Sequence, residues 1–267
     1  VSSCVREIDR ALAAYRFDEA ASAAYSFTRN TFCDWYVELA KPLFNGEDAA
    51  VTAETRATAA WVLNRILRLL HPFMPFITEE LWSQFGDKGQ RLINAEWPKL
   101  EGLEDKDAAD EIGWVIGLIS GIRSAKSEMN VPPGSKIPMV LIGAEQANRD
   151  RMAAYGELIS WLARLDGMEA VDAGTPPPSG SIQIVHREAT VALPVGDVID
   201  IAQEKARLEK EIAKEQGEES KVSKKLSNEG FMAKAPQAVV DENRERLAEH
   251  QAKVAQLRTA LERLSGL

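Results

Sequence analysis

The first 130 residues place apolar side chains at helical spacing. Val5, Ile8, Leu12 and Tyr15 recur at steps of three and four residues, which predicts a helix whose buried face reaches Tyr15. Thr52 is expected to cap a later helix, because its hydroxyl can accept a hydrogen bond from a free backbone amide. The helices predicted after the first run from Phe27 to a break at Pro42 and Asn45-Gly46, from Thr52 to Leu70, onward from Pro75, and from Asp107 to Met129. This part is therefore predicted to be a helix bundle.

Residues 131–196 change to a mixed pattern of short strands and one helix. Runs of β-type residues are bounded by glycine and proline, and a polar corner at Arg187-Glu188 indicates a hairpin. The predicted elements are a strand at Ile137–Ile142, a helix at Glu145–Leu165, and strands at Ser181–Val185 and Thr190–Val195. We expect a small α/β subdomain here.

Residues 197–267 show two heptad-like arms joined by a breaker loop around Gly230 and Pro236. The first arm repeats Ile201, Leu208, Ile212, Val222 and Leu226, with Glu215 and Glu219 as polar gaps. The second arm repeats Val240, Leu247, Val254, Leu257, Leu261 and Leu264, with His250 in register. Two equal arms of this kind predict an antiparallel coiled-coil hairpin. The fold class is thus mainly α, with domains at 1–130, 131–196 and 197–267.

The charges of the first arm are segregated. Five basic residues fall within about 60° of one another on a helical wheel, opposite the apolar seam; they are Arg207, Lys210, Lys214, Lys221 and Lys225. One interpretation is a solvated face with i,i+4 ion pairs. The other is a row of cations that follows a phosphate backbone by shape rather than by base sequence. The tip adds Lys234 and a lone aromatic, Phe231, which is suited to stacking on a base or to docking on another domain.

Composition narrows the class of protein. The 267 residues carry a net charge of −9, which argues against a protein that coats DNA but leaves local phosphate binding open. Two cysteines and no secretory leader favour a reducing cytoplasm, and the apolar segments are too interrupted to span a membrane. The chain starts at Val1 within a helical pattern, so we expect a fragment of a longer protein, and an intramolecular hairpin favours a monomer.

Candidate catalytic residues are few. Cys33 is expected to be a buried small apolar residue rather than a nucleophile, and His71 to be structural. Three scattered histidines and two cysteines offer no metal-ligand spacing. No catalytic or metal residue is therefore predicted. Two other hypotheses stay open at this point: a coiled coil that recruits a partner or dimerises, and a hydrolase that uses Cys33 or His71.

Four segments together resemble one family. They are Lys225–Pro236 (KLSNEGFMAKAP), Ser127–Pro133 (SEMNVPP), Phe32–Tyr36 (FCDWY) and His71–Phe76 (HPFMPF). The chain resembles the C-terminal region of bacterial valyl-tRNA synthetases, which are class I aminoacyl-tRNA synthetases. The last motif is shared with other synthetases for aliphatic amino acids, whereas the first two are more specific. The matches follow the family's order across nearly the whole chain.

The resemblance implies an anticodon-binding helix bundle, an α/β junction, and an arm that packs against the outer corner of tRNA-Val. It implies that ATP and Mg²⁺ belong to the parent's catalytic domain, with no cofactor in this fragment. The catalytic and editing domains of the full-length chain would be partners, and the parent would be a valine–tRNA ligase. This fragment is accordingly expected to bind tRNA and to activate no amino acid.

Basic residues of the bundle are the other candidates for tRNA contact. Arg65 and Arg68 are favoured, with Lys41 in the same bundle. Arg29 stands where the family usually has an aromatic residue, two positions after Phe27, which changes either local packing or a local tRNA contact. The helix that ordinarily precedes Val1 in the family would carry part of the anticodon-reading surface.

Overall fold

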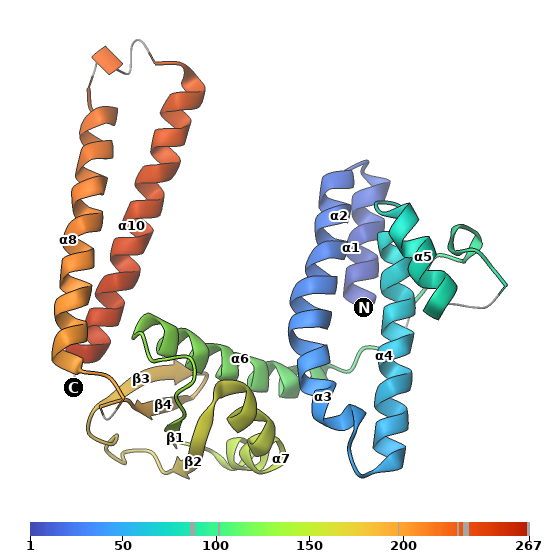
Figure 1. The fold of residues 1–267 in the computed structure, drawn as a ribbon, viewed down its shortest axis with the longest axis horizontal. Helices are drawn as coiled ribbons and strands as arrows, with labels where there is room; N and C mark the ends of the chain where they lie inside the picture. Colours follow the sequence, from blue (N-terminus) through green and yellow to red (C-terminus); the bar gives the residue numbers. More distant parts are fainter. Residues whose placement is uncertain (86–88, 101, 197, 229, 232–234, 266–267) are drawn as a thin grey trace. The chain divides into compact units, whose positions relative to one another are not determined.

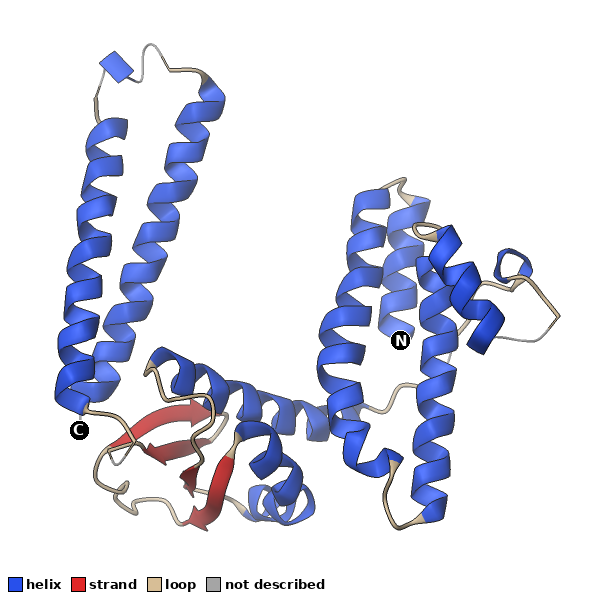
Figure 2. Ribbon diagram, in the orientation of Figure 1, coloured by secondary structure: helices blue, strands red, loops and turns tan. Residues whose placement is uncertain are grey.

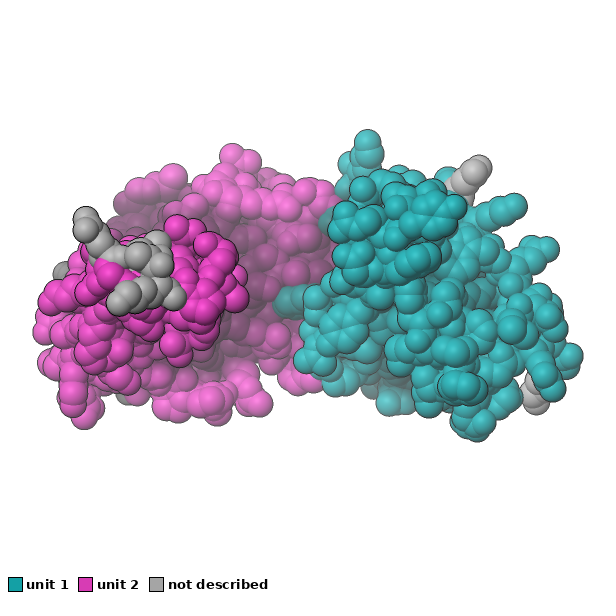
Figure 3. All heavy atoms as spheres, turned by 90° about the horizontal axis from the view of Figure 1, so that it is seen from above, with its two compact units in different colours: residues 1–109 teal, residues 110–267 magenta. Residues whose placement is uncertain are grey.

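The computed structural model describes residues 1–267 except 86–88, 101, 197, 229, 232–234 and 266–267. Contacts between Cα atoms divide the chain into two compact units, unit 1 at Val1–Ala109 and unit 2 at Asp110–Leu267 (Figure 3). Helices dominate both units, and the strands form one small sheet in unit 2 (Figure 2). The predicted mainly α fold class is confirmed. The predicted domain boundaries at 130 and 196 stay a prediction.

Unit 1 is a bundle of helices (Figure 1). One hydrophobic core of this bundle packs α1 and α2 against the C-terminal end of α4. It contains Val5, Ile8, Ala20, Ala24 and Leu69. The elements in order are α1 (Ser2–Ala13), α2 (Phe17–Ser26), a π-helix η1 (Phe27–Val37), α3 (Glu38–Phe44), α4 (Ala49–Leu70), α5 (Pro75–Phe85) and a 3₁₀ turn η2 (Leu92–Asn94). The backbone stays helical from α2 through η1 into α3.

Two predicted helix ends in unit 1 are wrong. Helix α1 stops at Ala13, and Tyr15 takes a left-handed φ of 57° and is 80% exposed, so it lies beyond the buried face. Helix α4 is capped by Asp48, whose carboxylate accepts from the amides of Ala50 and Val51 at 2.8 and 3.1 Å. Thr52 instead lies inside α4 and donates its hydroxyl to the Leu43 carbonyl. A carboxylate at the positive end of a helix is a stronger cap than a hydroxyl one turn later.

The π-helix η1 overturns another expectation. Cys33, predicted to be buried, is exposed. The prediction rested on the residue type, because free cysteines are among the residues most often buried, whereas in this π-helix Cys33 lies on the solvent side. Phe32 and Tyr36 stack in the same segment, with ring centroids 5.5 Å apart.

Unit 2 packs a long helix on a four-stranded sheet. Helix α6 (Lys106–Glu128) lies close to β3, because Gly117 and Gly121 leave room for the side chains of His186 and Ile184. The sheet order is β2-β1-β4-β3, with β1 and β2 parallel and the other pairs antiparallel. The elements are β1 (Ile137–Ile142), α7 (Gln146–Ala163), β2 (Leu165–Val171), β3 (Ser181–His186) and β4 (Ala189–Pro194). Strand β2 was not predicted from the sequence.

The C-terminal hairpin consists of α8 (Ile201–Leu226) and α10 (Gln237–Ser265), which run side by side (Figure 1). Asp200 caps α8 by accepting from the amide of Gln203 at 2.9 Å. The seam buries Leu208 and Ile212 on α8 against Val240 and Val254 on α10. The predicted antiparallel hairpin is confirmed. No described helix is both long and apolar enough to cross a membrane.

Candidate nucleic-acid interface

The basic residues of α8 line the side of the helix opposite its seam. Leu208 is fully buried and Ile212 is 9% exposed, whereas Lys210, Lys214, Lys221 and Lys225 are exposed. The separation follows from the helical period, because residues three or four apart share a face. We call these four lysines the lysine face of α8. The structure thus brings the predicted lysines together on one solvent-facing surface.

Arg207 differs from its neighbours. Its guanidinium contacts Glu204 at 2.6 Å and Glu211 at 2.5 Å on the same helix. The hydrogen bonds that Arg207 donates to Glu204, followed by the carboxylate charges, raise the pKa of Arg207 above its usual value. The positive charge of Arg207 is therefore largely compensated by these two carboxylates. The lysines carry most of the positive charge that faces solvent on this helix.

Two members of the lysine face have no acidic partner among the described residues. Within the part of the chain that the structure describes, no carboxylate lies within ion-pair distance of Lys210 or Lys214. Lys221 contacts Glu218 at 2.6 Å, an exposed i,i+3 pair of the kind that contributes little to stability. Unpaired, solvated cations can meet phosphate oxygens without first breaking an internal bond.

The hairpin tip adds an aromatic side chain to this surface. The Lys225 ammonium lies 4.9 Å from the ring centroid of Phe231, within the range of a cation–π contact. Phe231 is half-buried, and its amide is held by Asn228 at 3.0 Å. The predicted contact residue Lys234 lies outside the described residues.

The seam between α8 and α10 contains a cluster of three polar residues that joins the two helices. Glu215 is 6% exposed and contacts Lys253 Nζ and His250 Nδ1, each at 2.7 Å. The hydrogen bond from Lys253 and then that from His250 lower the pKa of Glu215 below its usual value. His250 therefore packs in the seam, as its heptad position indicates. Glu215 interrupts the apolar repeat of α8 but forms hydrogen bonds across the seam.

The predicted bundle residues are spread over three elements of unit 1. Arg29 is exposed on η1, and Lys41 on α3 contacts Glu38 at 2.5 Å. Arg65 lies over the Trp61 ring at 4.1 Å on α4. Arg68 donates to the Glu96 carbonyl at 2.9 Å and lies 5.2 Å from the ring centroid of Trp82. Arg65 and Arg68 therefore also have structural roles inside the bundle.

Comparisons with known proteins show which family the chain belongs to. Residues 1–141 match the family described as the anticodon-binding domain of tRNA ligase. The chain belongs to this anticodon-binding family. The match runs through unit 1 and α6 into β1. Residues 200–265 match a second family, the valyl tRNA synthetase tRNA binding arm, over the same segment as the α8–α10 hairpin.

Three curated relatives of this chain, each similar over nearly all of its length, are valine–tRNA ligases. The valine–tRNA ligase of Caulobacter vibrioides is 52% identical over 268 residues, covering 98% of this chain and 29% of the relative. Those of Mesorhizobium japonicum and Agrobacterium fabrum are 47% and 46% identical, each covering 99% of this chain and 28% of the relative. The chain therefore spans less than a third of the length of these curated relatives. The family resemblance inferred from the motifs is confirmed.

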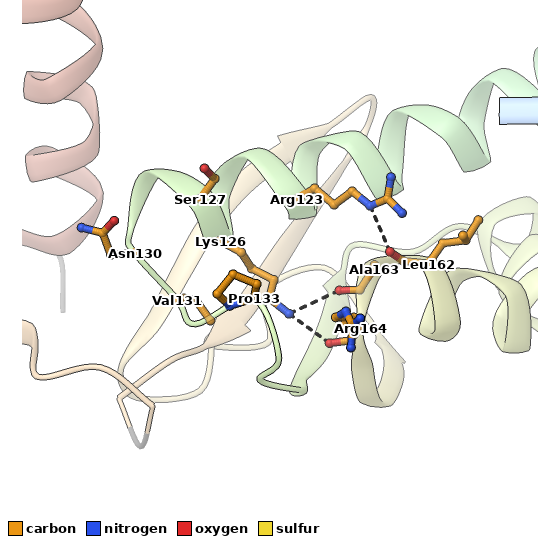
Figure 4. A pocket seen from close by; sticks show the side chains of 9 residues that line it. All are labelled: Arg123, Lys126, Ser127, Asn130, Val131, Pro133, Leu162, Ala163 and Arg164. Atoms are coloured by element: carbon orange, nitrogen blue, oxygen red, sulfur yellow. Dashed lines mark hydrogen bonds between the residues drawn. The ribbon is translucent and has the colours of Figure 1, made fainter. Parts of the chain in front are cut away.

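Sequence reasoning missed one group of cations in this family member. Arg123 and Lys126 on α6 and Arg164 at the end of α7 line one pocket of unit 2. The spacing of Arg123 and Lys126 by three residues puts them on one helical face, which was a signal available in the sequence. Arg164 could not have been added, because it lies near them only through the hydrogen bonds that Arg123 and Lys126 donate to carbonyls at the end of α7 (Figure 4).

Proposed function

We propose that this chain is the tRNA-binding C-terminal part of a valine–tRNA ligase. In this proposal, the α8–α10 hairpin grips the outer corner of tRNA-Val, where its D and T loops meet, and unit 1 binds the anticodon stem. The names of the relatives and of the two matching families support this assignment. The likeness covers nearly the whole chain, so it applies to both units.

The lysine face of α8 is the observation that carries the proposal for the hairpin. A row of exposed ammonium groups binds phosphates as point charges, whereas reading a base edge takes placed hydrogen-bond donors and acceptors. Such a face recognises the shape of folded RNA. The chain's net charge of −9 would repel RNA over most of its surface, so a local basic face also orients the encounter.

The catalytic steps belong to the rest of the parent protein in this proposal. The parent attaches valine to tRNA-Val with ATP and Mg²⁺, and its catalytic and editing domains are partners of this chain. Among the residues that the structure describes, no group of three or more His, Cys, Asp or Glu side chains could hold a metal ion. We assign this chain no catalytic residue and no cofactor, and we propose a cytoplasmic monomer.

The test is binding of tRNA-Val to the purified chain over a series of salt concentrations. With about four phosphates contacted, the logarithm of the affinity should fall against the logarithm of salt concentration with a slope of about −3 to −4. A tRNA-Val with a substituted anticodon serves as the second ligand. It should bind more weakly while keeping most of the salt slope, because the hairpin contacts do not involve the anticodon.

Two results would contradict the proposal. One is absence of binding at low salt, and the other is an affinity that does not depend on salt. Light scattering of the free chain gives a further check, because a dimer held by the hairpin would support a protein-interaction module in place of an RNA grip.

A further inference from the structure

A glycine interrupts the lysine face of α8. Gly217 is exposed, and it follows Lys214 by three residues and precedes Lys221 by four. These two spacings place residues on the same side of a helix. The two lysines are seven residues apart, so about 10 Å of helix length separates them at a rise of about 1.5 Å per residue. The helix backbone is therefore uncovered at Gly217, between two cationic side chains.

The helix itself does not require a glycine at this position. Gly217 has the backbone conformation of an α-helix, and its φ is not in the positive range that favours glycine. Apart from proline, glycine is the poorest helix former, because it loses the most conformational freedom on folding. An exposed position inside a helix is better filled by alanine, glutamine or lysine. Gly217 therefore lowers the stability of the hairpin.

Packing within the chain explains other helical glycines but not Gly217. Gly117 and Gly121 on α6 face strand β3, where a β-carbon would come within 3.0 and 3.2 Å of other side chains. A β-carbon at Gly217 would have no heavy atom within 4 Å among the described residues, the adjacent backbone of α8 aside. The missing side chain therefore leaves open space on the surface of α8 and relieves no contact inside the described part of the chain.

The open space at Gly217 lies between two cations. No carboxylate of the described residues is within ion-pair distance of Lys214, and Lys221 contacts Glu218 at 2.6 Å in an exposed pair. Exposed pairs contribute little to stability, so a phosphate can replace the carboxylate at Lys221. Each ammonium stands at the end of a flexible four-carbon stem. A phosphate held between the two ammonium groups can therefore approach the helix backbone at Gly217, where a longer side chain would keep it away.

We propose that Gly217 is the point at which the sugar-phosphate backbone of RNA comes closest to α8, with Lys214 and Lys221 on either side of the bound phosphate. The inference rests on the proposed function, which takes folded RNA as the ligand of the lysine face. Glycine is used where a ligand approaches the protein backbone closely, and residues that break a local rule are expected at functional sites. The lysine face then recognises RNA by its own shape as well as by its charge.

The decisive variant is Gly217→Gln, with Ser220→Gln as its matched control. Neither substitution changes the charge of the chain. Ser220 is also exposed on α8, but it lies about 100° round the helix from Lys221, outside the lysine face. Gly217→Gln should raise the midpoint of thermal unfolding, because glutamine is the better helix former. It should nevertheless weaken binding of tRNA-Val about tenfold and reduce the salt slope by about one, the effect of losing one phosphate contact. Ser220→Gln should keep the wild-type affinity and salt slope.

Gly217→Ala separates a blocked contact from a stiffer helix. Alanine and glutamine both favour the helix over glycine, so both variants lose any flexibility that Gly217 gives to α8. The methyl group of alanine reaches less far from the backbone than the side chain of glutamine. Gly217→Ala should therefore keep most of the affinity for tRNA-Val. A loss as large as that of Gly217→Gln would assign the effect to flexibility and overturn the inference.

The remaining outcomes distinguish the inference from the proposed function. Wild-type affinity and salt slope in Gly217→Gln would overturn the inference, while binding of tRNA-Val by the hairpin would stand. An equal loss in Ser220→Gln would also overturn it, since the position on the lysine face would then not matter. If the wild-type chain does not bind tRNA-Val at low salt, the proposed function fails and the inference fails with it.

Discussion

Lys253 of α10 lies with its ammonium 2.7 Å from the carboxylate of Glu215, a side chain buried in α8. His250 contacts the other carboxylate oxygen of Glu215 at the same distance. These bonds join the two arms midway along the hairpin, where the rest of the seam is largely apolar. A buried polar group that must find its partner can fix the register of a coiled coil. We therefore expect this cluster to align the arms.

The first prediction concerns acid stability. Hydrogen bonds from Lys253 and His250 lower the pKa of Glu215 below its ordinary 4.5. Ionised Glu215 thus stabilises the folded hairpin above the unfolded-state pKa, and this contribution is lost as the pH falls through the lowered folded-state pKa. Glu215→Gln should lower the unfolding midpoint at pH 7 and reduce its further fall between pH 7 and pH 3, measured by circular dichroism.

Glu219→Gln is the control for that experiment. Glu219 lies four residues later on α8, and among the described residues it accepts one exposed hydrogen bond, from Gln251 at 3.2 Å. Its substitution should leave the pH profile close to that of the wild type. If Glu215→Gln showed the wild-type midpoint and the wild-type acid dependence, the cluster would have no role in holding the arms.

The second prediction concerns the apolar seam. Leu208 is fully buried in α8, so Leu208→Ala should destabilise the hairpin by about 2 kcal/mol, the low end for a leucine in a thin core. Urea unfolding followed by circular dichroism measures the change. Gln216→Ala, an exposed position on the same helix, should change the free energy of unfolding by less than about 0.5 kcal/mol. Similar values for both variants would argue against the buried seam.

The third prediction separates RNA binding from stability. Changing Lys210, Lys214 and Lys221 together to Glu should weaken tRNA-Val binding by roughly tenfold or more without unfolding the hairpin, because these side chains face solvent. The control reverses Arg244, Arg246 and Arg258 on α10, which are exposed and make the same change in net charge. If the two triple variants lost affinity equally, the lysine face would have no special part in binding.

How far the sequence predicts this fold can be seen from single elements. The strand at Ile137–Ile142 is predicted to the residue, because its apolar run ends at glycine and proline signals. The hairpin follows from two long heptad patterns. Strand β2 was missed because Asp166 and Gly167 interrupt its pattern, and it exists through parallel pairing with β1, a contact between segments far apart in the chain.

The candidate site likewise has one part that the sequence predicts and another that depends on the fold. The lysine face was predictable, since it depends only on the helical period of α8. Pairing of the i,i+4 kind, as between Arg207 and Glu211, was one of the two interpretations of this face, but the sequence did not single out Arg207 as the basic residue that contacts two carboxylates. The left-handed turn at Arg164, whose carbonyl accepts from Lys126 of α6, depends on a contact between residues 38 apart in the chain. A prediction of tRNA contacts from charge alone therefore includes residues that the fold already uses.

The fourth prediction uses the two thiols. Cys33 is exposed on η1, whereas Cys4 is buried and its pKa is raised to about 11 by burial. A thiol reagent at pH 8 should therefore label Cys33 rapidly and Cys4 slowly, since the thiolate is the reactive form. Cys33→Ala should remove the fast reaction and leave tRNA affinity unchanged. Hydrolytic turnover that depends on Cys33 would revive a catalytic role.

Footprinting of tRNA-Val with the 267-residue chain tests the central claim most directly. If both units grip one tRNA, the anticodon stem-loop and the outer corner should be protected from hydroxyl-radical cleavage together. The lysine triple variant should then lose protection at the corner and keep it at the anticodon. A footprint at the anticodon alone with the wild-type chain, or a corner footprint unchanged by the lysine substitutions, would contradict the assignment of the α8 face as the tRNA grip.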